Sequence, residues 1–172
     1  QYSSPVQIPG TNWGRYVAGE YQTYGVKTDG TLWGWGLTHY GNLGQNEGGG
    51  LIKYSSPVQI PGTTWSPTLN KFDSGSYQEC IAIKTDGTLW TWGINEQGQL
   101  GQNQGPAQLG AASSPVQVPG TTWNKCSAGG TVVGAIKTNG TLWMWGNNIR
   151  GVLGQNSDST PGYATSSPVQ VP

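Results

Sequence analysis

Hydrophobic residues in this chain come in short runs that alternate with small or polar residues. In the run "TLWGW", Trp33 and Trp35 are two positions apart, so a β-strand would place both rings on one face. The run "YGVK" precedes it, and Asp29-Gly30 between the two is typical of a two-residue type I′ turn. The pattern predicts an antiparallel hairpin, and we find no signal for a helix.

The hairpin pattern occurs three times, which indicates an internal repeat. It reads "KTDGTLWGWG" from Lys27, "KTDGTLWTWG" from Lys84 and "KTNGTLWMWG" from Lys137. A Gly-Thr-x-Trp tetrad precedes each copy and "LGQN" follows it. The phrase "SSPVQ", closed by prolines and therefore typical of an edge strand, recurs between copies. Its starting points divide the chain into repeats 3–54, 55–112 and 113–165, with 166–172 as the first strand of a further repeat.

Each repeat predicts a small sheet of three or four antiparallel strands, which cannot bury its hydrophobic faces alone. Sheets of this kind become stable when they stack, and repeats of 50 to 60 residues are typical of propeller blades. We therefore predict an all-β fold in which residues 1–172 form one β-propeller segment.

The repeat resembles that of the regulator of chromosome condensation family. The stretch "AIKTDGTLWTWGINEQGQLGQN", residues 82–103, is similar to that family's blade pattern, and the other two copies agree with it. The resemblance implies a β-propeller, usually of seven blades, each a four-stranded antiparallel sheet. The "SSPVQ" variant is more similar to bacterial and bacteriophage members than to the eukaryotic founder.

Three repeats cannot close a ring of seven blades. Either the chain is a fragment of a longer array, the interpretation we favour, or several copies complete a ring. If "SSPVQ" closes the preceding blade, residues 3–9 belong to a blade outside this sequence. The edge strands at both ends would then be unpaired, so we expect further copies of the chain or another protein as the partner.

Composition narrows the partner. Only 9% of the residues are charged and the formal net charge is zero, whereas nucleic acids and anionic membranes are bound by clustered Lys and Arg. No apolar run approaches the length of a membrane span. We therefore expect neither a nucleic-acid partner nor membrane insertion. The 29 glycines favour many tight turns, and the nine tryptophans argue against disorder.

No constellation of residues predicts catalysis. The single histidine, His39, lies in a loop where the other repeats have Glu96 and Ile149. No triad, phosphate-binding loop, calcium loop or carboxylate pair can be recognised. Asp29 and Asp86 are explained by their turns. We predict neither an enzyme nor a cofactor nor a metal site. Cys80 and Cys126 lie at different repeat positions, and a disulfide between them or two free thiols remain alternatives, as does the redox compartment.

The tryptophans predict the core of the repeat, because all nine fall on equivalent positions: Trp13, Trp33, Trp35, Trp65, Trp90, Trp92, Trp123, Trp143 and Trp145. The alternative is an aromatic platform for sugars or peptides. Among them, the tryptophans of the Gly-Thr-x-Trp tetrad are the set that we expect to be partly exposed.

Binding residues are expected where loops differ inside a constant frame. The loop before each "LGQN" carries such a pair: His39-Tyr40, Glu96-Gln97 and Ile149-Arg150. We expect a non-catalytic structural or interaction module on a virion, as a fibre or decoration subunit, or on a bacterial surface. One alternative is a protein-binding regulator or inhibitor, which the resemblance connects to a GTPase exchange factor and a β-lactamase inhibitor. Another is a propeller that binds surface carbohydrate.

Overall fold

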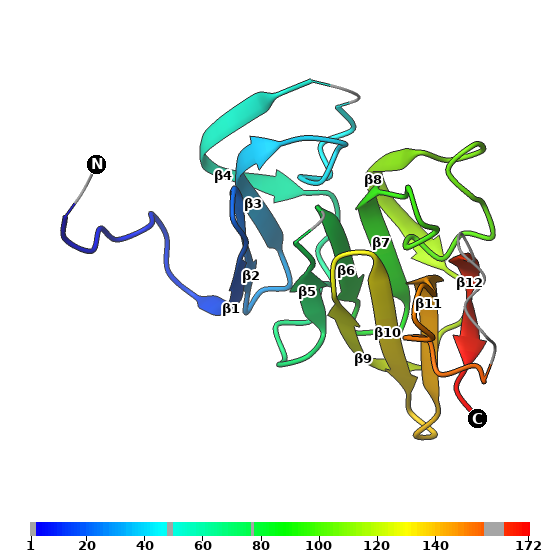
Figure 1. Ribbon diagram of the computed structural model, residues 1–172. Helices are drawn as coiled ribbons and strands as arrows, with labels where there is room; N and C mark the ends of the chain where they lie inside the picture. The colour runs from blue at the N-terminus through cyan, green and yellow to red at the C-terminus, as the bar shows by residue number, and fades with distance from the viewer. Residues whose placement is uncertain (1–2, 48–49, 77, 157–163) are drawn as a thin grey trace.

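Three four-stranded antiparallel sheets follow one another along the chain, as the computed structural model shows (Figure 1). The structure describes residues 3–47, 50–76, 78–156 and 164–172. In each sheet the strands lie side by side in chain order. The all-β prediction is confirmed. We call the sheets the first, second and third blade.

The strands are short, as the repeat predicts. The first blade contains β1 (Trp13–Ala18), β2 (Gln22–Lys27), β3 (Leu32–Thr38) and β4 (Ile52–Ile60). The second contains β5 (Phe72–Ser74), β6 (Glu79–Ile83), β7 (Leu89–Ile94) and β8 (Ala111–Val118). The third contains β9 (Trp123–Ala128), β10 (Val132–Lys137), β11 (Leu142–Asn147) and β12 (Ala164–Gln170).

The central hairpin forms where the sequence predicts it, but its turn is not type I′. The Gly30 amide donates to the Lys27 carbonyl, and the Lys27 amide donates to the Thr31 carbonyl. Gly30 has a φ of 83°, whereas Asp29 is absent from the residues with positive φ. The loop therefore has three residues, a type I turn followed by a left-handed glycine. The reason is the Asp29 carboxylate, which stays in the turn and accepts from the amide and hydroxyl of Thr31.

The "SSPVQ" phrase forms the fourth strand of each blade. It lies within β4, β8 and β12, which pair with β3, β7 and β11. Of residues 166–172, which begin a further repeat in the sequence, 166–170 therefore belong to the outer strand of the third blade. The first copy, Ser3–Pro9, lies outside any strand and is exposed throughout.

The blades pack face to face through two hydrophobic clusters. Between the first and second blade lie Tyr24, Leu32, Ile60 and Trp92, each with no exposed surface. Between the second and third lie a comparable set that includes Trp145. The strands β1 and β5 contact each other, as do β5 and β9, so the first strands lie at one side of the stack.

Antiparallel pairing sends the connections to two opposite edges. The β2–β3, β6–β7 and β10–β11 turns lie at one edge, which we call the hairpin edge. The β3–β4, β7–β8 and β11–β12 connections lie at the other, which we call the loop edge (Figure 1). No helix in the described ranges is long and apolar enough to cross a membrane.

Candidate functional site

The variable residue pairs lie on the loop edge, one pair on each blade. Each loop turns at a glycine that accepts from the next one, as Gly41 does from the Gly44 amide at 2.8 Å. The leucine between them, Leu43 in the first blade, is fully buried, as are its counterparts Leu100 and Leu153. Each pair is thus held on a turn whose anchor is part of the core.

The pairs differ in character and in exposure. His39 and Tyr40 place their ring centroids 3.9 Å apart, and Tyr40 is 38% exposed with a φ of 56°. Glu96 is exposed and Gln97 is half-buried. Ile149 is 47% exposed and Arg150 is exposed with a φ of 77°. The structure brings all six side chains to one edge, and their role in binding stays a prediction.

A buried hydrogen bond ties each of two loops to the following blade. The Trp92 indole donates to the Asn42 carbonyl at 2.7 Å, and the Trp145 indole donates to the Gln99 carbonyl at 2.8 Å. Asn42 and Gln99 directly follow the turn glycines. The second tryptophan and "LGQN" keep a constant spacing in all three copies, but a spacing within one copy does not predict a contact between blades. The loop edge is therefore positioned by the blade packing itself.

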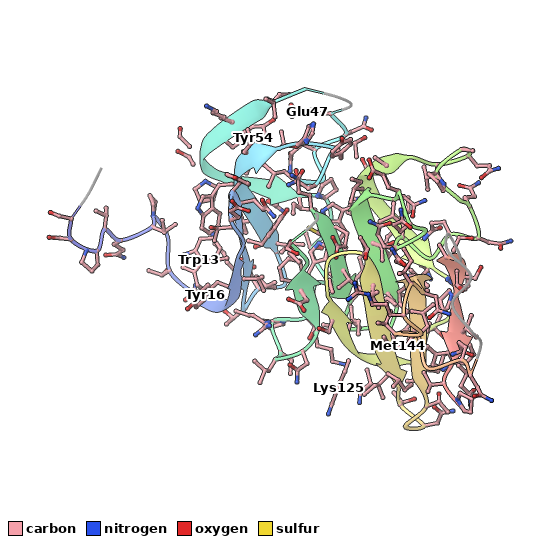
Figure 2. The ribbon with its side chains drawn as sticks, viewed as in Figure 1. Trp13, Tyr16, Glu47, Tyr54, Lys125 and Met144 are labelled. Carbon is pink, nitrogen blue, oxygen red and sulfur yellow. The ribbon has the colours of Figure 1, made fainter. Side chains whose placement is uncertain are left out.

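The loop of the first blade has one more contact on this edge. The Tyr54 hydroxyl on β4 donates to Glu47 Oε1 at 2.6 Å, which raises the pKa of Tyr54 (Figure 2). This bond joins the end of the "LGQN" loop to the strand that returns from it.

The hairpin edge has a different feature: on each blade a lysine makes cation–π contacts with two indole rings. Lys84 Nζ lies 4.8 Å from the Trp65 ring centroid and 3.9 Å from that of Trp90. Lys27 and Lys137 occupy the same position in the other blades. The Trp90 indole also donates to the Thr88 hydroxyl, which in turn donates to Asp86. Each lysine covers aromatic surface that a sugar ring would need.

The exposure of the tryptophans differs from expectation. Trp65 and Trp123 of the Gly-Thr-x-Trp tetrad are each 1% exposed, because the hairpin of their own blade and the preceding blade cover them. Trp92 and Trp145 are fully buried. The half-buried tryptophans are instead Trp33, Trp90 and Trp143 at the hairpin edge, together with Trp13 and Trp35 of the first blade.

The two cysteines and the acidic residue Glu79 are buried. Cys80 and Cys126 are free and buried, and burial raises the pKa of Cys80 to about 12. Burial also raises the pKa of Glu79 to about 8. Among the described residues, no three His, Cys, Asp or Glu side chains are grouped so that they could hold a metal ion.

Comparison with known proteins gives one consistent result. Residues 86–136 match the model of the regulator of chromosome condensation (RCC1) repeat. The chain is 31% identical over 134 residues to the protein RCC2 homolog of Danio rerio, a match that covers 77% of this chain and 26% of that protein. It is 29% identical over 160 residues to the ultraviolet-B receptor UVR8 of Arabidopsis thaliana, covering 90% of this chain and 33% of the receptor.

Solved structures agree on the fold. The structure of Prp20p from Saccharomyces cerevisiae superimposes with a TM-score of 0.74 at 18% identity, covering 94% of this chain and 38% of that one. The three sheets have the fold of RCC1-type propeller blades. The chain spans about a third or less of the two curated relatives described above.

Proposed function

We propose that this RCC1-type chain is a non-catalytic protein-binding module whose contact surface is the loop edge. The observation that supports the proposal is the contrast within each loop. Leu43, Leu100 and Leu153 are fully buried, while the residue pairs on the same turns vary and each has at least one exposed member. A rigid scaffold with variable exposed side chains is the usual arrangement of a recognition surface.

Of the two protein-level interpretations, the binding regulator now comes first. The similar proteins include a yeast protein described by its binding to Gsp1p and histones, and the same yeast protein bound to Kap60. The placement on a virion or cell surface rests on low charge and on the "SSPVQ" variant, and it stays a prediction. Glycan binding also stays a prediction, although two of the tryptophans proposed for it are buried.

The test is a binding measurement with matched edge variants. The immobilised chain is presented with Gsp1p, core histones and Kap60, and each affinity is measured by biolayer interferometry. We expect Tyr40→Ala and Arg150→Ala on the loop edge to weaken binding by about tenfold or more, because they remove exposed aromatic and charged groups. Thr64→Ala and Thr122→Ala, exposed near the hairpin edge, are the controls and should change it less than about twofold.

Two results would count against the proposal. Equal losses of affinity in the hairpin-edge controls would mean that the contact surface is not confined to the loop edge. No binding of any of the three probes would remove the support that the regulator has from the similar proteins and return the surface-module interpretation to first place.

A further inference from the structure

The basic residues of this neutral chain gather at the hairpin edge. Six of the eight lie there, in two positions that recur on every blade: Arg15, Lys71 and Lys125 on or directly before the first strands, and Lys27, Lys84 and Lys137 on or directly after the second strands. Among the described residues, the acidic side chains at this edge are those of Asp29 and Asp86. The hairpin edge therefore has an excess of positive charge.

The loop edge has no such excess. Its described charged residues are Glu20, Glu47, Glu96, the buried Glu79, Lys53 and Arg150. Charges that are mixed along the sequence are thus separated in the fold, because antiparallel strands bring equivalent positions of every blade to the same edge. An anionic group is attracted to the hairpin edge in preference to the loop edge.

A hollow of about 420 Å³ lies at the hairpin edge, between the second and third blades. Lys71 and Lys84 line it, together with five hydroxyl side chains: Ser66, Thr85, Thr121, Thr122 and Thr138. The lining also includes Asp86, whose Oδ1 already accepts from the amide and hydroxyl of Thr88. The hollow thus combines two ammonium groups with several hydroxyl donors.

The hollow results from a difference in length between the second and third blades. Five residues, 66–70, separate the tetrad tryptophan from the first-strand cation in the second blade, whereas the first and third blades have one residue there, Gly14 and Asn124. At the first junction this insertion fills the space. A β-carbon built on Gly14 would lie 2.9 Å from Pro67 Cβ and 3.4 Å from Thr28, whose counterpart in the second blade lines the hollow. The third blade lacks the insertion and leaves the space open.

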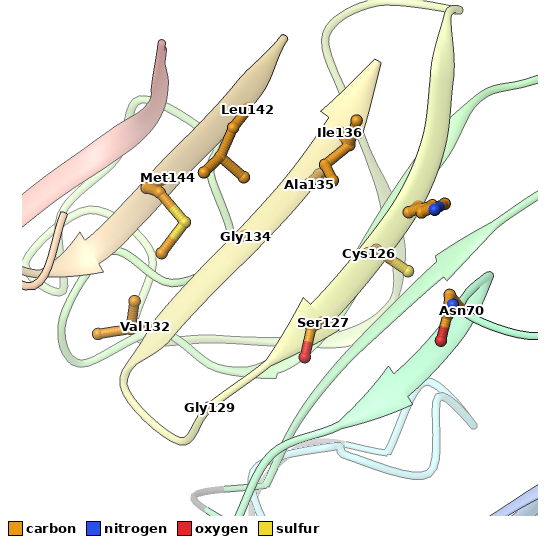
Figure 3. Close-up of a pocket in the computed structure, with 11 residues that line it drawn as sticks. Asn70, Cys126, Ser127, Gly129, Val132, Gly134, Ala135, Ile136, Leu142 and Met144 are labelled. Atoms are coloured by element: carbon orange, nitrogen blue, oxygen red, sulfur yellow. The ribbon is translucent and has the colours of Figure 1, made fainter. Parts of the chain in front are cut away.

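The same insertion holds Lys71 beside the hollow. The Cys126 amide on β9 donates to the Asn70 carbonyl at 2.9 Å, which anchors the end of the insertion on the third blade (Figure 3). Lys71 Nζ donates to Asn124 Oδ1, also at 2.9 Å. Burial lowers the pKa of Lys71, and the amide oxygen of Asn124 has no charge to offset that burial. An anion in the hollow would stabilise this ammonium group.

Lys84 is held in place by a different contact. Its ammonium lies 3.9 Å from the Trp90 ring centroid and 4.8 Å from that of Trp65. A cation–π contact restricts the side chain but leaves its positive charge in place. The two cations that line the hollow are therefore both positioned before any ligand arrives, which lowers the entropic cost of binding.

We propose that this hollow binds a phosphate group through Lys71, Lys84 and the threonine hydroxyls around them. A phosphate group has several acceptor oxygens and up to two negative charges, which match two ammonium groups and hydroxyl donors from separate segments. The group belongs either to free inorganic phosphate or to a phosphorylated side chain of another protein, and the chemistry of recognition is the same. This inference concerns the hairpin edge and does not depend on the loop-edge proposal.

The experiment is isothermal titration calorimetry of the full chain at constant ionic strength. The probes are inorganic phosphate, a phosphoserine peptide and the same peptide without its phosphate. We expect binding of the phosphorylated probes alone. Lys71→Met should weaken that binding by about tenfold or more, because a charge-assisted hydrogen bond is lost. Lys53→Met removes an exposed lysine from the loop edge, and this matched control should change the affinity less than about twofold.

A second variant separates a binding site from general attraction by charge. Thr138→Trp fills the hollow and keeps both lysines, and since Thr138 is exposed, the fold should tolerate it. Binding should be lost in this variant. Tighter binding of the phosphopeptide than of inorganic phosphate would support the proposal with a protein as the source, and equal affinities would support it with the free anion. Failure of both phosphorylated probes to bind would overturn the proposal, and so would binding that Lys71→Met or Thr138→Trp leaves unchanged.

Discussion

Residues 3–11 and residues 55–63 have the same nine letters, "SSPVQIPGT", and different structures. In the second copy Ser55–Ile60 belongs to β4 and pairs with β3. In the first copy no strand forms. Ile60 has no exposed surface, whereas Ile8 is 41% exposed. Identical local sequence therefore does not decide the conformation here.

The difference lies in what each copy has beside it. The second copy follows a complete hairpin, and the Gln45 side chain of the "LGQN" loop donates to the Gln59 carbonyl at 3.0 Å. Gln102 and Gln155 make the same bond to the fourth strands of the other blades. The first copy has no preceding β-strand within the described residues. The segment forms a strand only where a neighbouring strand and the glutamine of an "LGQN" loop are present to pair with it.

The strongest test of this comparison truncates the same residue in both copies. Ile60→Ala should lower the free energy of unfolding by about 2–5 kcal/mol, because it opens a cavity between the first and second blades. Ile8→Ala should change it by less than about 0.5 kcal/mol. Both values come from urea unfolding followed by tryptophan fluorescence. Losses of stability of similar size in the two variants would show that Ser3–Pro9 is packed in solution.

A second test uses equivalent positions whose residues differ. Gln22 on β2 and Glu79 on β6 both pair with the glycine that ends the repeated phrase, Gly36 and Gly93 respectively. Burial raises the pKa of Glu79 from 4.5 to about 8, and it outweighs the backbone amides of Glu79 and Gly130, which lower it. The folded state therefore binds the proton more tightly than the unfolded state does.

The consequence is a loss of stability with rising pH. The contribution of Glu79 is complete below a pH of about 4.5, falls as the pH rises, and levels off above about 8. Between about pH 5 and pH 7 the loss should be about 2 kcal/mol. Glu79→Gln, which copies the first blade, should remove this slope in urea unfolding across that range. A slope that persists unchanged in the variant would mean that Glu79 is ionised in the folded protein.

Much of the fold can be predicted from the sequence because the same local pattern occurs three times, so each copy supports the assignment of the others. Three copies of "DGTLW" or "NGTLW" placed the hairpins, and the two-residue spacing of the tryptophans placed them on one face. The turn type was wrong because Asp-Gly fits both a type I′ turn and a three-residue loop. Only the position of the Asp29 side chain, which caps Thr31, separates them.

Packing between blades could not be predicted in the same way. The Gly-Thr-x-Trp tetrad looks like a loop, yet Trp65 and Trp123 are buried because each lies against the hairpin of its own blade and against the preceding blade. The contacts made by the backbone carbonyls of Asn42 and Gln99 cannot be recognised from residue type, since every residue has a backbone carbonyl. The repeat is enough to place the six loop residues on one edge, but their spacing does not indicate which partner they would bind.

The smallest expected effect on stability concerns the tryptophan that follows each copy of "SSPVQIPGT". The Trp65 indole donates to the Pro61 carbonyl at 3.2 Å, and the Trp123 indole donates to that of Pro119 at 3.2 Å. Trp13 is half-buried, and its indole nitrogen is buried without an acceptor. Trp65→Phe should therefore cost about 1 kcal/mol more than Trp13→Phe in urea unfolding, through the lost hydrogen bond. Trp123→Phe is the matched control and should behave like Trp65→Phe. If Trp13→Phe is as costly as either, then the first copy closes over its tryptophan in solution and supplies the acceptor.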